Sequence, residues 1–274
     1  MTEVDPSSCE GPDAASPRRR IGLRLAYDGG AYSGWQAQPQ QRTVQGMLAA
    51  AIATVDPTAD ALRGSSRTDA GVHALDQVAA FSCSRPLEPE AWLRAINANL
   101  PKDIVVVHAW QAADSFDPVG AAVRKRYRYR LYDDPVRPVF SRAHVWRQPA
   151  RLNIEAMQAA AGALVGEHDY SSFETASSPR LSKVRTIYDL AVCRVDTPER
   201  ANAEVQVEVE GNGFLYNMVR IIVGSLAMVG VGRKPASWMA EALAARHRPA
   251  AGPTAPPHGL TLVSIQLDAS AADG

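Results

Sequence analysis

The stretch from Gly64 to Ala74 reads Gly-Ser-Ser-Arg-Thr-Asp-Ala-Gly-Val-His-Ala and gathers the residue types that an acid-dependent reaction requires. Asp69 is its only carboxylate, and Arg67 supplies a nearby cation that can keep an acid ionised. Ser, Thr, Asp and Gly are also the usual residues of turns, so an ordinary loop is the alternative to a catalytic acid. His73 is either an acid–base group or, as we favour, a loop histidine.

Arginines alternate with other residues from Arg124 to Arg130. In a strand, Arg124, Arg126, Arg128 and Arg130 share one face, whereas Lys125, Tyr127 and Tyr129 share the other. Arginines in such a row repel one another unless anions lie against them, and a phosphate backbone is the obvious candidate. The two tyrosines then offer flat surfaces for an unstacked base. The alternative is a solvated edge strand that its charges protect from aggregation.

Arg220 lies within the long apolar run from Phe214 to Gly232. Asn217 and Arg220 interrupt this run, which favours a buried helix over a membrane span. A buried guanidinium needs an anionic partner, and the cleft carboxylate already identified is Asp69. Such a pair predicts an ionised Asp69, while the alternative is an arginine that reaches the surface at the helix edge.

Several other kinds of chemistry are not indicated by the sequence. We find no pair of carboxylates at hydrolase spacing, no Ser or Cys nucleophile signature and no cluster of metal ligands. The three cysteines are far apart, which predicts neither a disulfide framework nor a zinc site and favours a reducing cytoplasm. The formal net charge is +0, so any nucleic-acid surface must be local.

The order of apolar and polar segments predicts an α+β protein made of two successive βαββαβ units. We expect a disordered tail over residues 1–20, one ferredoxin-like half over 21–113 and a second over 114–270, with a cleft between them. The expected strands are 21–27, 60–64, 77–84, 104–110, 122–132, 184–195, 204–209 and 260–267, and the expected helices are 43–55, 88–97, 154–164, 214–229 and 237–246.

The chain resembles the tRNA pseudouridine synthase A family in several motifs that follow one another in order. The most specific is Arg67-Thr68-Asp69-Ala70-Gly71-Val72-His73. The others are Tyr27-Asp28-Gly29, Gly34-Trp35-Gln36, Asn99-Leu100-Pro101, Arg126-Tyr127-Arg128-Tyr129, Met218-Val219-Arg220-Ile221-Ile222-Val223-Gly224 and Gly259-Leu260. The resemblance implies the pseudouridine synthase fold, with a mixed, mainly antiparallel sheet and a central cleft. It also implies isomerisation of uridine to pseudouridine at positions 38 to 40 of the tRNA anticodon stem-loop, by a homodimer that needs no cofactor or metal.

The same resemblance assigns roles to individual residues. It makes Asp69 the catalytic carboxylate and Arg220 its ion-pair partner, with Tyr127 stacked on the target uracil. It places Leu260 in the apolar wall of the pocket and gives Arg126 and Arg128 to RNA contacts, while Arg67 either contacts RNA or braces the loop. Three roles stay open for the carboxylate of Asp69: addition to C6 of uracil, attack on C1′, or removal of a ribose proton.

One segment departs from the family pattern. The chain has Phe116-Asp117-Pro118-Val119-Gly120 where the resemblance predicts a His-Ala-Arg type sequence after the phenylalanine, so a basic RNA contact is missing or supplied elsewhere. A non-catalytic RNA-binding protein of the same fold is the main alternative function, although a pure binder has no need for Asp69. A glycosidase is a weaker one, because it requires a second carboxylate.

Overall fold

A computed structural model describes residues 18–175, 182–197 and 200–269. Its first half contains two helices between four strands. These are β1 (Arg19–Tyr27), α1 (Val44–Val55), β2 (Asp60–Gly64), β3 (His73–Cys83), α2 (Pro89–Asn99) and β4 (Ile104–Ala112), with the 3-10 turn η1 (Gly29–Ala31) after β1.

The second half repeats this order and adds short elements. The repeated elements are β5 (Ala122–Tyr132), α3 (Ile154–Gly162), β8 (Val184–Val195), β9 (Glu204–Gly211), α4 (Met218–Gly230) and β10 (Leu260–Leu267). The additional ones are β6 (Trp146–Arg147), β7 (Gly166–Asp169), η2 (Ser171–Phe173), α5 (Trp238–Ala245), η3 (Arg248–Ala250) and η4 (Pro257–Gly259).

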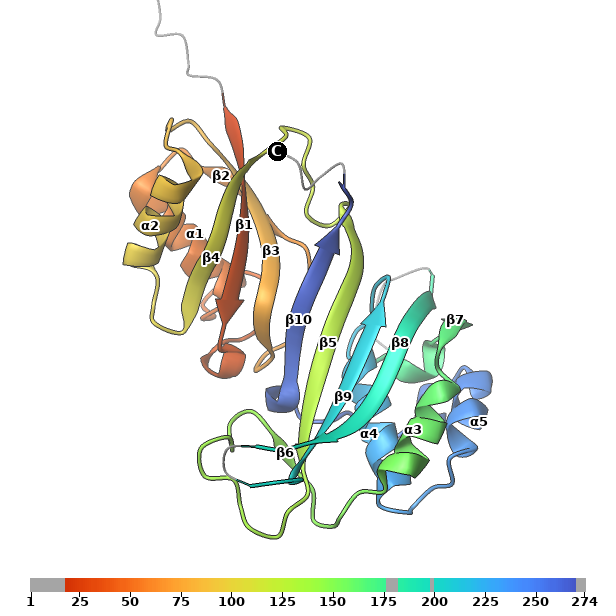
Figure 1. Ribbon diagram of the computed structural model, residues 1–274. Coiled ribbons are helices and arrows are strands. Elements are labelled where there is room, and N and C mark those ends of the chain that lie inside the picture. The colour runs from red at the N-terminus through yellow and green to blue at the C-terminus, as the bar shows by residue number, and fades with distance from the viewer. Residues whose placement is uncertain (1–17, 176–181, 198–199, 270–274) are drawn as a thin grey trace, which may run out of the picture.

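Local sequence explains where several helices begin. The Thr43 hydroxyl accepts a hydrogen bond from the Gly46 N–H and so caps α1, and the Asn153 side chain caps α3 in the same way through Ala156. Pro89 opens α2, where its missing N–H costs nothing. These residues determine where the helices begin that cover the outer parts of the sheet (Figure 1).

The ten strands that the structure describes form one sheet, in the order β4-β1-β3-β10-β5-β9-β8-β7, with β2 paired to β3 and β6 paired to β5. The order β4-β1-β3-β2 in the first half matches β10-β5-β9-β8 in the second, which is the arrangement expected for two ferredoxin-like halves. Figure 1 shows α1 and α2 at one end of this sheet and α3, α4 and α5 at the other. The α+β class and the pattern of two βαββαβ units are therefore confirmed.

Strand β3 changes partner along its length. Its first residues pair in parallel with β10, His73 opposite Thr261, whereas its later residues pair with β2, Ser82 opposite Asp60. The loop 65–72 joins β2 to β3 and lies where this pairing changes. The sequence motif around Asp69 thus sits at the junction of the two halves.

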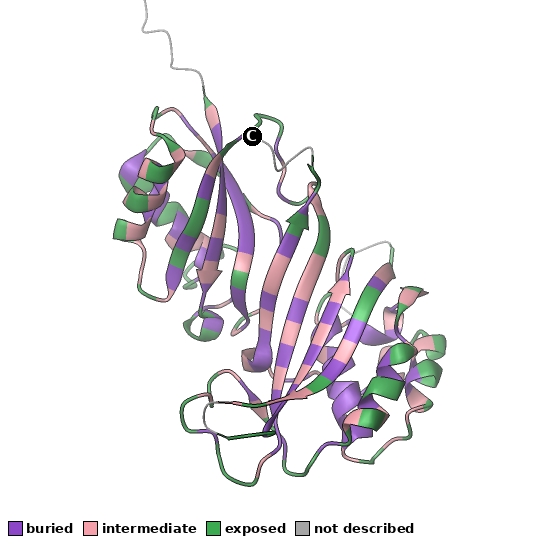
Figure 2. Ribbon diagram, in the orientation of Figure 1, coloured by how far each residue is buried: buried purple, intermediate pink, exposed green. Residues whose placement is uncertain are grey.

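A continuous hydrophobic core extends through both halves, and Figure 2 shows the buried residues following the central strands while the helices expose their outer faces. The largest buried side chains include Trp35, Trp92, Phe81, Tyr129 and Tyr132. Because the core contains residues from β1 to β10, it fixes the two halves relative to each other.

Some expectations need correction. Strand β1 begins at Arg19, and Arg20 is buried and donates to the Ser82 hydroxyl, so these two residues belong to the sheet rather than to the expected tail. Strand β5 is paired on both sides and is not an edge strand. Helix α4 begins at Met218 rather than at Phe214, because Asn217 has a left-handed backbone.

Two short strands, β6 and β7, were not expected from the sequence. Residues 1–17 of the expected tail lie outside the described part of the chain. The division of the chain at residues 113 and 114 stays a prediction. Among the helices that the structure describes, none has the length and apolar character needed to cross a membrane.

Candidate active site

Backbone hydrogen bonds to the turn after β1 hold the loop 65–72 on one side. The Trp35 N–H donates to the Thr68 carbonyl over 3.0 Å, and the Gly71 N–H donates to the Tyr32 carbonyl over 3.2 Å. Gly34 has a φ of +89°, and a Cβ atom there would lie 2.8 Å from the Thr68 carbonyl oxygen. Only glycine permits this close approach of the two backbones.

Side chains from three strands of the sheet also hold this loop. The Gln77 side chain accepts from the Ser66 N–H over 3.1 Å and donates to the Ser66 carbonyl over 2.7 Å. The Tyr27 and Thr68 hydroxyls lie 2.7 Å apart, and the Lys125 ammonium donates to the Ser65 carbonyl over 2.7 Å. The backbone that carries Asp69 is therefore fixed by contacts from β1, β3 and β5.

Arg220, in the first turn of α4, contacts Asp69. The distance from Arg220 Nη1 to Asp69 Oδ2 is 3.1 Å, and the side chains are only 15% and 23% exposed. Arg220 also donates to the Ala255 carbonyl over 2.8 Å and to the Asn217 side-chain oxygen over 2.6 Å. The predicted pairing of Arg220 with Asp69 is confirmed, and the alternative of an arginine reaching into solvent is wrong.

The acidity of Asp69 differs from the expectation. Burial raises the pKa of Asp69 above its usual range, although the neighbouring Arg220 guanidinium lowers it. The sequence argument considered only the lowering by Arg220, since the extent of burial depends on the folded chain. A desolvated carboxylate with a raised pKa is more basic and less hydrated than one on the surface, which suits a nucleophile or base.

Tyr127 and Leu260 lie on the face of the sheet that α4 covers. The Tyr127 hydroxyl is 2.9 Å from the Ser66 hydroxyl, and the Tyr127 ring packs edge-on against Phe214 at 5.2 Å. Burial, with a further contribution from the charge of Asp69, raises the pKa of Tyr127 to about 12, so its hydroxyl stays protonated. Leu260 pairs with Tyr129, and its side chain shares the face of Tyr127 because the two tyrosines are two residues apart.

Two neighbours of this group were not found from the sequence. Phe214 supports the ring of Tyr127, and Asn217 holds the guanidinium of Arg220 while donating to the Thr175 hydroxyl over 2.9 Å. Asn217 has a φ of 61°, a conformation that asparagine tolerates better than most residues. A polar residue three positions before a buried arginine, within an apolar run, was the available signal for it.

Arg67 was expected to contact RNA, to brace the loop or to keep Asp69 ionised. Its side chain is exposed, and no ion pair with another described residue involves it. In the structure the cation beside Asp69 is Arg220 instead.

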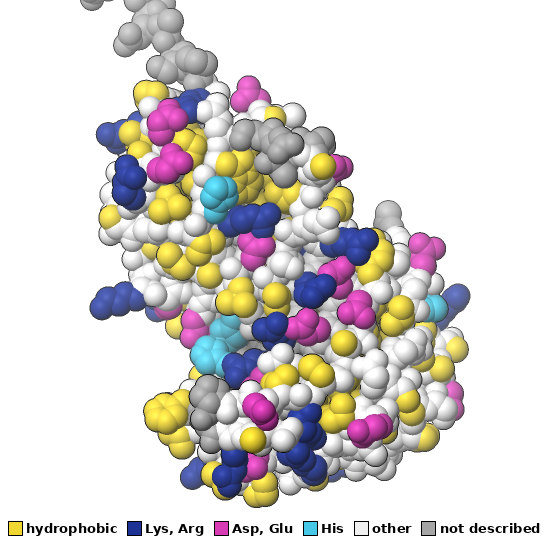
Figure 3. Space-filling model, in the orientation of Figure 1, with side chains coloured by type: hydrophobic (Ala, Val, Ile, Leu, Met, Phe, Trp, Pro, Cys, Tyr) yellow, Lys and Arg dark blue, Asp and Glu magenta, His cyan; other side chains and the backbone are white. Residues whose placement is uncertain are grey.

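The arginines of β5 lie on the opposite face from Tyr127 and contact glutamates of β9. Arg126 pairs with Glu210 at 2.7 Å and Arg128 with Glu208 at 2.6 Å. Figure 3 views this face, where basic and acidic side chains lie side by side over the middle of the sheet. The anions that the arginine row requires are thus protein carboxylates. A contact of Arg126 and Arg128 with RNA stays a prediction.

Asp28, His73 and His144 form the one group in the described part of the chain that resembles a metal site, and no such cluster was expected from the sequence. The Gly29 N–H donates to His73 Nδ1 over 3.1 Å, and His73 Nε2 lies 3.2 Å from the His258 carbonyl. Both ring nitrogens of His73 already have backbone partners, and burial lowers the pKa of this ring. We therefore describe the group as a hydrogen-bonded junction and assign no metal to it.

Comparisons with known proteins identify the family of this chain. The family model for tRNA pseudouridine synthase matches residues 25–118 and 160–268. The chain belongs to the tRNA pseudouridine synthase family. Relatives named tRNA pseudouridine synthase A include one from Thermoanaerobacter sp. (strain X514), which is 42% identical over 90% of this chain and 99% of its own length. The Bacillus subtilis (strain 168) relative is 41% identical over 91% of this chain and 99% of its own length.

The segment that departs from the family pattern forms an acidic turn. The Asp117 carboxylate accepts from the N–H groups of Val119 and Gly120 and pairs with Arg63 at 3.3 Å. Phe116 is buried against Trp110. This turn therefore uses its charged residue to shape itself and adds no cation for RNA.

Proposed function

We propose that this protein isomerises uridine to pseudouridine at positions 38 to 40 of the tRNA anticodon stem-loop, with Asp69 as the catalytic carboxylate. One observation carries the proposal: a desolvated Asp69 lies on a rigid loop, paired with Arg220 at 3.1 Å. Membership of the tRNA pseudouridine synthase family supports the same reaction.

The reaction breaks the N1–C1′ bond of uridine, turns the base and forms a C5–C1′ bond. The proton at C5 is lost and N1 gains one, so the product is an isomer and no oxidant or reductant is consumed. The carboxylate of Asp69 adds to C6, attacks C1′ or removes a ribose proton, and each of these roles requires its ionised form. Arg220 stabilises that form in a site where water is largely excluded.

The surrounding side chains suit a flipped uracil. The target base must leave its stack, and an aromatic surface at Tyr127 offsets part of the lost stacking. Leu260 is buried on the same face of the sheet and would supply an apolar wall. Arg67 is an exposed residue of the loop that carries Asp69 and is available to a phosphate.

Release of tritium from tRNA labelled at C5 of uridine tests the proposal. We expect release with the wild type and none with Asp69→Asn, while the control Asp117→Asn, which removes a carboxylate from the turn between β4 and β5, keeps its activity. Release by Asp69→Asn at the wild-type rate would exclude Asp69 from the mechanism. Release from no variant, together with tight tRNA binding, would identify a non-catalytic RNA-binding protein.

We also propose that the protein acts in the cytoplasm as a homodimer. Buried Cys83 and exposed Cys193 are both free thiols, which suits a reducing compartment. Sedimentation equilibrium tests the dimer, and a molar mass equal to that of one chain would contradict it.

A further inference from the structure

The connection between β5 and β6 becomes basic after Asp133 and Asp134, whose carboxylates pair with Arg194 and Arg200. From Pro135 to Arg147 it contains Arg137, Arg142, Arg147 and His144 but no Asp or Glu, whereas the whole chain has 29 residues of each sign. Figure 1 shows this loop projecting beyond the end of the sheet at which β10 begins. We call residues 135–147 the basic loop.

The basic loop also exposes apolar side chains. Phe140 is 86% exposed, Val139 is 63% exposed and Val136 is 53% exposed, and Phe140 is the most exposed large hydrophobic residue in the part of the chain that the structure describes. An aromatic ring flanked by arginines is the combination that proteins use to stack on unpaired bases and contact phosphates.

Backbone contacts hold the basic loop in shape. The Arg147 guanidinium donates to the Pro135 carbonyl over 3.0 Å, and the His144 N–H donates to the Ser141 carbonyl over 2.8 Å. Arg142 donates to the Val139 carbonyl, next to Phe140. The exposed ring is thus presented by an ordered loop and loses little conformational freedom on binding.

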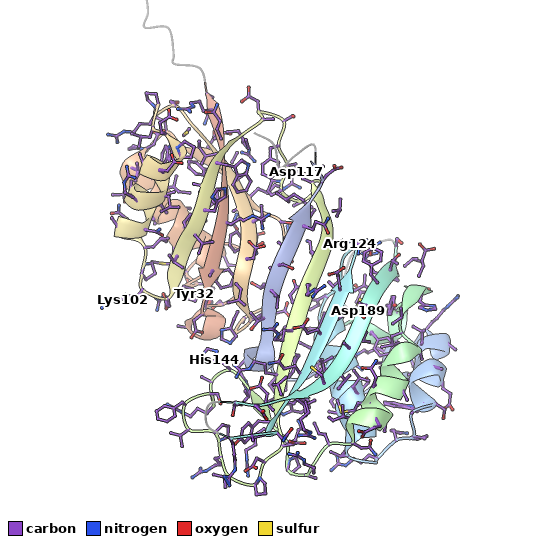
Figure 4. All side chains as sticks on the ribbon, in the orientation of Figure 1. Tyr32, Lys102, Asp117, Arg124, His144 and Asp189 are labelled. Atoms are coloured by element: carbon purple, nitrogen blue, oxygen red, sulfur yellow. The ribbon has the colours of Figure 1, made fainter. Side chains whose placement is uncertain are left out.

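The base of the loop contacts residues that are close in sequence to the candidate active-site residues. The ring of His144, labelled in Figure 4, lies 4.6 Å from that of His73. His73 is the first residue of β3, directly after the loop carrying Asp69, and so is a strand residue and not the expected loop histidine. The next residue, Val145, accepts a hydrogen bond at 3.1 Å from His258, two positions before Leu260. A nucleic acid that places a uridine beside Asp69 therefore passes within reach of the basic loop.

We propose that the basic loop is a second tRNA-contact surface, in which Phe140 stacks on an unpaired base while Arg137 and Arg142 contact phosphates. This inference rests on the proposed function for its substrate, but it concerns residues outside the catalytic pocket. The charge of the loop favours a polyanion over a second copy of the chain. The three exposed apolar side chains are also far smaller in area than the roughly 800 Å² per partner that a stable dimer needs.

Equilibrium binding of unmodified tRNA tests the proposal, measured by fluorescence anisotropy at several salt concentrations. We expect Phe140→Ala to raise the Kd about tenfold. Arg137→Ala/Arg142→Ala should raise it and lower the slope of log K against log salt by about 1.5 to 2. The matched control Arg94→Ala/Arg233→Ala removes the same charge from exposed positions, one on α2 and one in the turn after α4, and should leave both quantities unchanged. At saturating tRNA, kcat stays at the wild-type value in all three variants.

Other outcomes separate the two proposals. If wild type releases tritium but Phe140→Ala and the arginine pair bind tRNA like the control, the loop proposal is overturned and the catalytic one stands. If wild type releases no tritium, the catalytic proposal fails, and the binding measurements still decide the loop. A dimer that Phe140→Ala converts to monomers without changing the Kd would assign the loop to self-association instead.

Discussion

Replacing Arg220 with methionine removes the cation beside Asp69 and keeps a side chain of similar length. At the observed 3.1 Å, two unit charges attract by roughly 5 kcal/mol when the effective dielectric constant is about 20. Water reaches part of both side chains and reduces this figure, so a change of about 1 to 3 pKa units is expected. Because Arg220 lowers a pKa that burial already raises, its loss moves the pKa of Asp69 further upward.

The assay is tritium release measured from about pH 5 to pH 9. Since the reaction needs ionised Asp69, the acidic limb of log kcat against pH should move about 1 to 3 units to higher pH in Arg220→Met. Arg220→Lys retains the charge and should move the limb by much less. An unchanged limb in Arg220→Met, with activity retained, would show that Arg220 does not set the ionisation of Asp69.

Three further changes probe the same site. Folding raises the pKa of Asp69, so the protonated carboxyl contributes to the stability of the fold, and this contribution is lost as the pH rises through the folded-state pKa. Asp69→Asn, which cannot ionise, should therefore melt at or above the wild-type temperature at neutral pH. Asn217→Gly keeps the left-handed backbone but removes the oxygen that holds the guanidinium, and should lower kcat roughly tenfold with little change in KM. Gly34→Ala should lower the melting temperature more than Gly232→Ala, since both have positive φ but only Gly34 approaches another backbone atom.

Each of these three predictions has a result that would contradict it. Melting of Asp69→Asn several degrees below wild type would mean that the ionised carboxylate stabilises the fold. Wild-type kcat in Asn217→Gly would remove its positioning role, and thermal unfolding of that variant separates positioning from a general loss of structure. Equal melting temperatures for the two glycine variants would show that the contact with the Thr68 carbonyl is easily relieved.

The sequence predicted the partner of Arg220 because a buried guanidinium needs an anion, and Asp69 was the candidate already in view. It did not predict the sign of the pKa change of Asp69, which depends on how much protein surrounds the carboxylate. The roles of Asn217 and Phe214 were missed for a related reason. Phe214 contacts Tyr127 and Asn217 contacts Thr175, both distant in the sequence, and the backbone of Asn217 is left-handed.

The pairing of the β5 arginines with glutamates was only partly predictable from the sequence. Glu204, Glu208 and Glu210 alternate with apolar residues along β9, which matches the alternation on β5. Only the register, with Arg126 opposite Glu210 and Arg128 opposite Glu208, shows that the two rows meet. Strand register is set by the whole sheet and cannot be read from either strand alone.

The position of β10 affects how the molecule assembles during synthesis. This strand follows all others along the chain, yet it lies between β3 and β5, where Asp76 accepts a hydrogen bond from the Ile265 N–H. A ribosome therefore makes the strands on both sides of the junction long before the strand that joins them. Until β10 emerges, the edges of β3 and β5 have no partner there, and such exposed edges favour aggregation. We expect nascent chains that end before Leu260 to need protection by chaperones and to lack activity.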